Sequence, residues 1–242
     1  MVSLLSGAFQ FSETRSGGPL APRGLHQVAG AGTVFLLLWI LCTVFSTPAL
    51  RRLRGLAAGA LFLCAIACFT FALPMLHAFV AQMLFATLAC FALFTSPYWE
   101  TPAEPLDKTS WESLPALAGV TPILVACQVF LGVAYRHRVL GVMPHLAGAL
   151  LVSLAILGIS LYLLQNFPEH RALHAAAVAA VTITGIQVGL GMVALMMALV
   201  GADTTLVAVL AVVAHVFTGA LMLGASLLLA IQLRRSASAT GV

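Results

Sequence analysis

The sequence predicts an all-α polytopic integral membrane protein: a bundle of about seven transmembrane helices in two pseudo-repeated halves. Of its 242 residues, 62% are apolar and only 7% are charged, whereas about a quarter of the residues of a soluble domain carry charge. β-Barrel alternation is absent, because runs such as FLLLWIL are apolar on every face. The composition therefore excludes a soluble globular enzyme, a disordered chain and a nucleic-acid-binding protein.

The charged residues cluster and leave long uncharged stretches between them. Roughly 20 residues, at about 1.5 Å per residue, are enough to cross the hydrocarbon core of a bilayer. The stretch 55–99 is about twice that length, and Pro74 marks the place where a short turn would divide it. The expected spans are 26–46, 55–73, 75–96, 114–134, 142–165, 172–199 and 206–232.

The loop 97–113, rich in proline and acidic residues, divides the chain into a three-helix half (1–99) and a four-helix half (114–242). Trp99 and Trp111 in this loop are expected to be interfacial anchors. Basic residues are more numerous on one side of the expected bundle, which places the C-terminus in the cytoplasm and the N-terminus outside. We expect the bilayer to be a bacterial plasma membrane.

The titratable groups expected inside the membrane are histidines. No Asp, Glu, Lys or Arg lies within the expected spans, which argues against ion-coupled transport and proton pumping. Four histidines fall in the first, third, fifth and seventh helices, which run in the same direction, and each lies in the first half of its helix. They should all lie toward the outer side. These residues are His26, His77, His145 and His215, whereas His137, His170 and His174 are expected at the solvated interface.

A small residue, Gly or Ala, lies four positions after each of these histidines, on the same helical face. Such a residue leaves a flat slot beside the imidazole. The residues expected to line the slots are Gly30, Ala81, Gly148 and Gly219.

Four histidines in one register favour a planar macrocycle. Any single histidine is equally well explained as an interfacial or interhelical hydrogen-bonding group. Haem iron accepts two axial imidazoles from facing helices, and its porphyrin needs a slab of space lined by small and aliphatic side chains. Zinc is less favoured because its sites require three or four close ligands. The count fits two bis-histidine haems.

A short repeat precedes two of the histidine-bearing helices. The segment QVFLG, from Gln128 to Gly132, recurs as QVGLG, from Gln187 to Gly191. Glycine allows close helix approach and glutamine supplies an interhelical hydrogen bond, so helix packing is the favoured interpretation. Contact with the edge of a haem is the alternative.

These residues resemble the haem A synthases, membrane proteins that oxidise haem O to haem A for cytochrome oxidase assembly. The stretch LPMLHAFVAQMLFATLACFALFTSPYW is similar to the family's fourth helix. QVFLGVAYRH with PHLAGALLV is similar to its fifth and sixth helices, and AHVFTGALMLGASLLLA is similar to its last. The resemblance covers most of residues 24–232.

The resemblance implies two bundles, each with a histidine pair for one haem. His26 and His77 would hold the substrate haem O, and His145 and His215 would hold a haem b cofactor. The implied activity is oxidation of a ring methyl of haem O to a formyl group. The implied partners, besides haem and the lipid bilayer, are a haem O-producing enzyme or oxidase subunits.

Three departures from the family pattern bear on activity. The family's first helix is missing, the paired cysteines of its outer loops have no counterpart, and its glutamate three positions before the first histidine is replaced by Arg23. Glu13 in the tail is only a positional candidate for a base. The alternative is therefore a non-catalytic dihaem membrane protein that transfers electrons or handles haem during oxidase assembly.

Overall fold

The computed structural model describes residues 21–106 and 113–239, and the statements below refer to those residues. Trp111 and Glu13 lie outside the described ranges. The long helices are α2 (Ala21–Ser46), α3 (Arg54–Phe69), α4 (Pro74–Thr95), α6 (Leu114–Arg136), α7 (Val142–Asn166), α8 (Arg171–Leu199) and α9 (Leu206–Ala239). A 3₁₀ helix, η1 (Pro48–Leu53), and a short helix, α5 (Pro97–Glu100), complete the helical elements.

The described residues confirm the expected fold class. They contain seven helical segments long and apolar enough to cross a membrane, and no strand. Each expected span falls on one long helix. The chain is thus an integral membrane protein with an all-α, polytopic bundle.

The 55–99 stretch divides where the proline predicted it. Helix α3 ends at Phe69 and α4 begins at Pro74. Proline is suited to the first position of a helix because the amide hydrogen that it lacks would have no intrahelical partner there. The amide of His77 donates to the carbonyl of Leu73, 2.9 Å away, so the histidine lies in the first turn of α4.

The chain forms two compact units, each described here by itself. Unit 1 comprises the residues up to Phe91 together with Gln187–Ala220, and unit 2 comprises Ala92–Ile186 together with the residues from Leu221 onward. Helices α8 and α9 therefore contribute a segment to each unit. The expected halves 1–99 and 114–242, each with its own haem site, stay a prediction.

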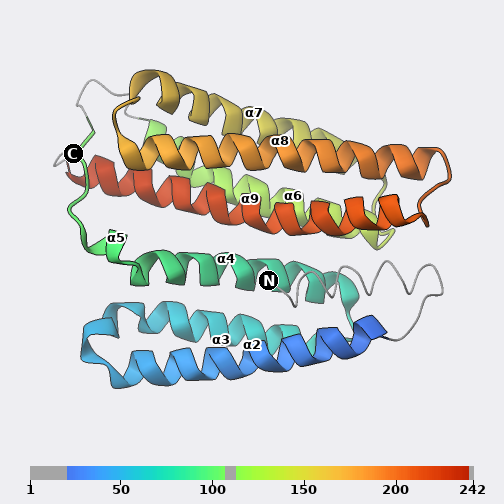
Figure 1. Ribbon diagram of the computed structural model, residues 1–242, viewed down its shortest axis with the longest axis horizontal. Coiled ribbons are helices and arrows are strands. Elements are labelled where there is room, and N and C mark those ends of the chain that lie inside the picture. The colour runs from blue at the N-terminus through green and yellow to red at the C-terminus, as the bar shows by residue number, and fades with distance from the viewer. Residues whose placement is uncertain (1–20, 107–112, 240–242) are drawn as a thin grey trace. The chain divides into compact units, whose positions relative to one another are not determined.

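In unit 1, helices α2, α3 and α4 pack against one another (Figure 1). Their buried core draws on all three helices, with Leu37 from α2, Ala60 and Cys64 from α3, and Leu84 from α4. Large apolar side chains cover the opposite face of α2, where Trp39 is 66% exposed. An apolar surface of that kind is stable against lipid and costly in water.

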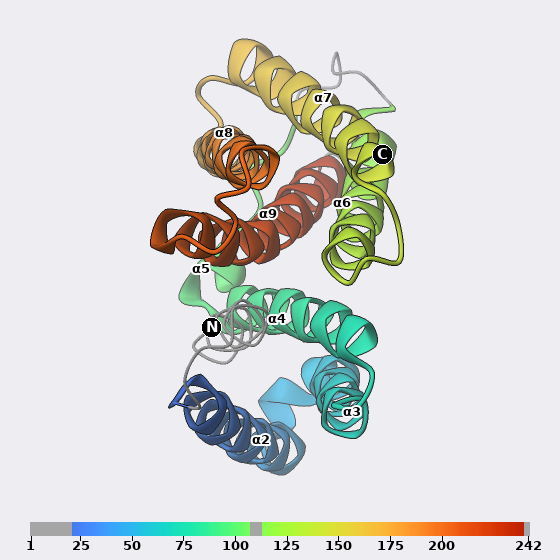
Figure 2. The same ribbon diagram turned by 90° about the vertical axis from the view of Figure 1, so that its right-hand side faces the viewer.

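In unit 2, α6 and α7 lie side by side and are joined by a tight turn (Figure 2). Arg138 adopts the left-handed conformation there, with φ 60°. The amide of Val139 donates to the carbonyl of Ala134 at 2.9 Å, which is the five-residue closure of a Schellman motif. The α8–α9 turn has the same form, with Gly201 at φ 70° and Ala202 donating to Met197.

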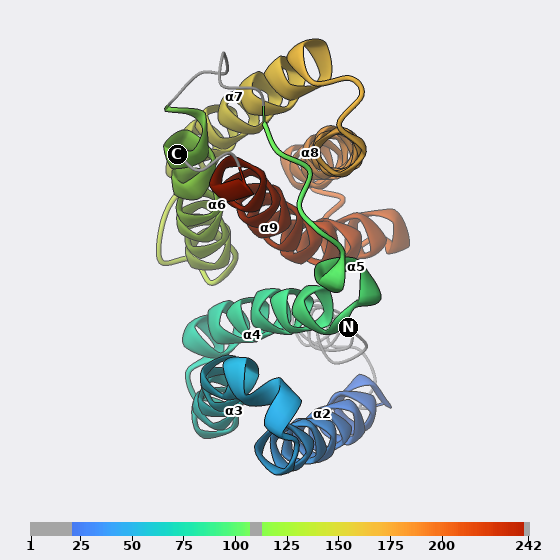
Figure 3. The same cartoon turned by 90° about the vertical axis from the view of Figure 1, so that its left-hand side faces the viewer.

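The segment that follows α5 is fastened to the C-terminal part of α9 (Figure 3). Arg235 donates to the carbonyls of Trp99 and Thr101. Its guanidinium also lies 4.5 Å from the centroid of the Trp99 ring. The Leu106 amide donates to the Ser236 carbonyl at 3.4 Å. Backbone and side chain together hold residues 99–106 against the helix.

The expectation that His170 lies at a solvated interface is wrong, because its side chain is buried under this segment, with 5% of the residue exposed. Its Nε2 lies 3.1 Å from both the Glu104 carbonyl and the Ser236 hydroxyl. The amide of Leu173 donates to its Nδ1 at 3.3 Å, so the ring caps the first turn of α8. The sequence showed that His170 lies in a loop, but it did not show that the segment containing Glu104 would cover the histidine.

Candidate functional site

His26 and His77 lie close together in unit 1. Their ring centroids are 5.7 Å apart, and their planes are inclined at 76°. Both residues are partly buried. The Nδ1 atom of His77 lies 2.9 Å from the carbonyl oxygen of Ala67, near the C-terminal end of α3. A carbonyl can only accept, so Nδ1 carries the proton and Nε2 has the lone pair in the neutral ring.

His215, also in unit 1, contacts both the backbone and the side chain of Gln187. Its Nδ1 lies 3.1 Å from the backbone oxygen of Gln187, and its Nε2 lies 3.4 Å from the Nε2 of the same residue. The carbonyl again requires a proton on Nδ1, so the side-chain amide must donate to the ring Nε2. The Oε1 of Gln187 then faces the hydroxyl of Thr218, which donates to it.

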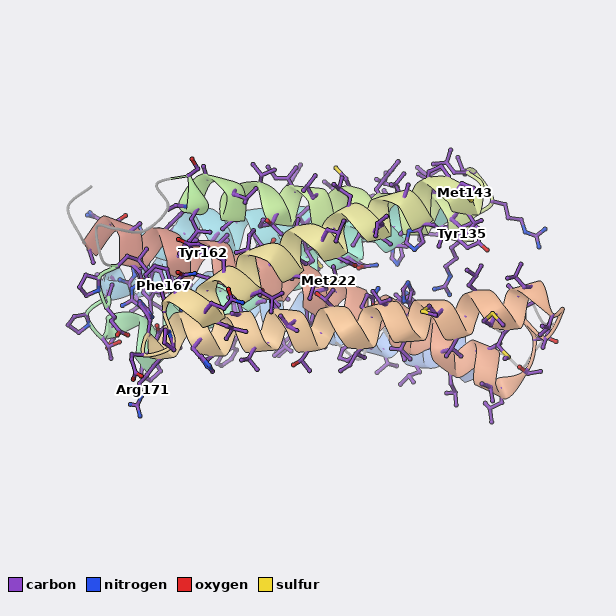
Figure 4. The ribbon with its side chains drawn as sticks, turned by 90° about the horizontal axis from the view of Figure 1, so that it is seen from above. Tyr135, Met143, Tyr162, Phe167, Arg171 and Met222 are labelled. Carbon is purple, nitrogen blue, oxygen red and sulfur yellow. The ribbon has the colours of Figure 1, made fainter. Side chains whose placement is uncertain are left out.

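His145 occupies the corresponding place in unit 2. Its Nδ1 lies 2.9 Å from the Nε2 of Gln128, and that amide also donates to the backbone oxygen of His145 at 2.9 Å. The ring of Tyr135 stacks on the imidazole, with centroids 6.4 Å apart and planes within 9°. Tyr135 lies at the same end of the α6–α7 pair as Met143 (Figure 4).

The imidazole rings of His145 and His215 each pack against the backbone of a glycine. A Cβ built on Gly132 would lie 2.9 Å from Cε1 and 3.2 Å from Nδ1 of His145. A Cβ built on Gly191 would lie 2.9 Å and 3.3 Å from the same atoms of His215. The repeated segments QVFLG and QVGLG therefore place a glutamine and a glycine against a histidine of the following helix. We call each such set a histidine cradle: Gln128, Gly132 and His145, or Gln187, Gly191 and His215.

The cradles were the part of the site that sequence reasoning missed. The repeat was visible, and packing was its favoured interpretation. The order of elements indicated a contact with histidine, because each copy of the repeat immediately precedes a helix that carries one. In the structure, Gly132 and Gly191 contact His145 and His215 at nearly the same distances. The glutamines differ, because the side chain of the first copy meets Nδ1 of its histidine and that of the second copy meets Nε2.

The surroundings of the small residues expected to line a slot differ between sites. A Cβ on Gly30 would have no atom within 4 Å. The face of Gly148 is covered by the Gln128 side chain, and that of Gly219 by Gln187, whose Nε2 would lie 3.2 Å from a Cβ there. At these two glycines the adjacent space contains a glutamine amide. Ala81 is partly buried on α4.

A second glutamine approaches Gly219. Gln82, on α4, is 5% exposed, and its Oε1 would lie 3.9 Å from a Cβ on Gly219. This oxygen is buried and has no hydrogen-bond partner among the described residues. An unsatisfied buried acceptor costs roughly 1–3 kcal/mol, so Gln82 is an energetically unfavourable group unless something donates to it.

Two further observations concern grouped metal-ligand side chains and the protonation of His137. No group of three or more His, Cys, Asp or Glu side chains placed to hold a metal ion occurs in the described ranges. At the C-terminal end of α6, burial and the charge of Arg136 lower the pKa of His137 from its ordinary value.

We compared the chain with protein-family models, curated proteins and solved structures, and none of them matches it.

Proposed function

We propose that this chain is a histidine-ligated membrane haem protein with an activity similar to that of the haem A synthases, the oxidation of a methyl group of haem O to the formyl group of haem A. The observation that carries the proposal is the spacing of His26 and His77. Metal–imidazole bonds are about 2 Å long, so rings on opposite sides of one metal ion have centroids roughly 6 Å apart. The observed centroid separation is 5.7 Å.

The hydrogen bonds of His77 and His215 also fit such a group. Metal-ligating histidines commonly donate their other ring N–H to a backbone carbonyl, which sets the tautomer. His77 has this arrangement with Ala67, and His215 has it with Gln187. In both rings the carbonyl leaves Nε2 with the lone pair that a metal ion requires.

In this proposal, His26 and His77 hold the substrate haem O, and His145 and His215 hold haem b. The partnership of His145 with His215 stays a prediction. When bound, haem supplies one-electron and oxygen chemistry. The residues of this chain ligate the group, fix its orientation and exclude water with apolar side chains.

The second candidate is a non-catalytic dihaem protein for electron transfer or haem handling, with a haem O-producing enzyme or oxidase subunits as partners. The observation that favours it is Arg23 at the place of the family's glutamate. Reconstitution with haem O, an electron donor and oxygen separates the two candidates: haem A is formed only by the first.

An absorption spectrum tests the haem proposal itself. Protein purified in detergent should show a bis-histidine low-spin spectrum. His26→Ala and His77→Ala should each remove one haem, whereas His174→Ala, at an exposed histidine of α8, should leave the haem content unchanged. If the variant lacking His26, His77, His145 and His215 retained the full haem content, the assignment would be wrong.

A further inference from the structure

We infer that the side chain of Gln187 is a switch that holds the Nε2 lone pair of His215 in the ligand-free protein and moves to Gln82 when a metal ion takes that lone pair. The inference rests on the proposed function for the identity of the metal-bearing ligand, which is haem. Its first half, the hydrogen bond from Gln187 to His215, depends only on the contacts within unit 1.

The contact between Gln187 and His215 is weak enough to be displaced. The two nitrogen atoms are 3.4 Å apart, beyond the 2.7–3.2 Å of an ordinary N–H hydrogen bond. The other bond to the ring, from Nδ1 to the backbone oxygen of Gln187, is shorter at 3.1 Å. Losing the side-chain contact therefore leaves the ring oriented and its tautomer unchanged.

An alternative partner for the released amide lies nearby. The Nε2 of Gln187 and the Oε1 of Gln82 both approach Gly219, at 3.2 Å and 3.9 Å from the position of a Cβ on that glycine. The Gln82 oxygen is a buried acceptor without a donor. A rotation of the Gln187 amide away from His215 would satisfy it. The missing donor at Gln82 Oε1 is explained if the Gln187 amide has two positions, one on His215, as described, and one on Gln82.

Gly219 has a defined part in this switch. A side chain at this position would crowd the Gln187 amide, because its first carbon would already lie 3.2 Å from the amide nitrogen. Thr218 donates to Gln187 Oε1 in the described conformation and also lies within hydrogen-bonding distance of the Ala214 carbonyl, at 2.9 Å. It can therefore keep a partner after the glutamine has moved.

The first experiment uses the haem-free protein labelled with ¹⁵N-histidine. His215 should show a protonated Nδ1 and a hydrogen-bonded, unprotonated Nε2. In Gln187→Leu, the Nε2 resonance should move toward that of a ring nitrogen without a donor, while Nδ1 stays protonated. Gln128→Leu, the matched change in the other cradle, should leave the His215 resonances in place. An unchanged Nε2 resonance in Gln187→Leu would overturn the inference whether or not the protein binds haem.

The second experiment measures haem affinity. Gln187→Leu should bind haem roughly threefold to tenfold more weakly than wild type, because the bond from the released amide to Gln82 is lost together with the weaker bond to His215. Gln82→Leu should bind more weakly by a similar factor, because the released amide has no acceptor, and its haem-free His215 spectrum should match wild type. Equal affinities in all three proteins would contradict the switch. A wild-type protein that binds no haem would instead contradict the proposed function, and the ¹⁵N result would still stand.

Discussion

A Cβ added to Gly191 would lie 2.9 Å from Cε1 of His215, closer than such atoms approach one another in folded proteins. The imidazole therefore rests directly on the backbone of the preceding helix. Gly132 and His145 have the same relationship at the same distance. The absence of a side chain at Gly132 and Gly191 is therefore required by the histidine rings.

Gly191→Ala should therefore destabilise the protein by about 1–3 kcal/mol, because the added methyl group displaces the imidazole ring of His215. The measurement is thermal unfolding in detergent, together with the ¹⁵N resonances of His215. Gly189→Ala is the matched control, since a Cβ there meets no atom within 4 Å, and helix propensity predicts a gain of about 0.5–1 kcal/mol. Equal stabilities for the two variants would show that the contact between Gly191 and His215 has no energetic role.

Gln82→Leu should leave the stability of the haem-free protein unchanged or raise it by about 1 kcal/mol. Its Oε1 is a buried acceptor without a partner, and replacing such a group with an apolar one removes its desolvation cost. Gln187→Leu provides the contrast, because it removes donors and acceptors that His215 and Thr218 use. A clear loss of stability in Gln82→Leu would mean that its amide already has a partner, such as a buried water molecule.

His170→Ala should cost about 1–3 kcal/mol of stability. The change removes the cap on the Leu173 amide and the buried bonds to Glu104 and Ser236. His170→Asn should recover part of the loss, because asparagine is a good N-cap residue. The exposed His174 supplies the control, and His174→Ala should change stability by less than about 0.5 kcal/mol. Chemical unfolding in mixed micelles would rank the three variants.

Arg138→Gly should stabilise the α6–α7 turn by about 0.5–1 kcal/mol. Arg138 has φ 60°, a conformation that costs an L-residue about 1–2 kcal/mol and costs glycine little. The reciprocal change, Gly201→Ala at φ 70°, should be destabilising by about the same amount. Melting temperatures that move in the same direction for both variants would contradict this account of the turns.

Stability should also depend on pH through His137. Its pKa is lowered by burial and by the charge of Arg136, so the unfolded chain binds more protons than the folded protein just below pH 6.5. Stability therefore rises with pH across the interval between the lowered pKa and about 6.5, and it is lost as the pH falls through that interval. His137→Gln should flatten this part of the stability profile, measured as melting temperature against pH. A profile unchanged by the substitution would assign the dependence to another group.

The membrane spans follow from sequence alone because the requirement is local. Every buried backbone group in a bilayer must be satisfied within its own helix, so a long uncharged stretch has few alternatives. The turn at Pro74 and the all-α fold class were predicted for this reason. The pairing of His26 with His77 was instead an expectation drawn from a family resemblance.

Only the tertiary structure determined what surrounds each histidine. The contact of Gln187 with His215 depends on the rotation and height of α8 against α9, and no short-range pattern specifies those two quantities. His170 shows the same limit, since its burial comes from residues 99–106, which are distant in sequence. The sequence determined which groups enter the membrane, because transfer to lipid is a property of each segment. The partners of those groups depend on packing between segments, which only the folded bundle defines.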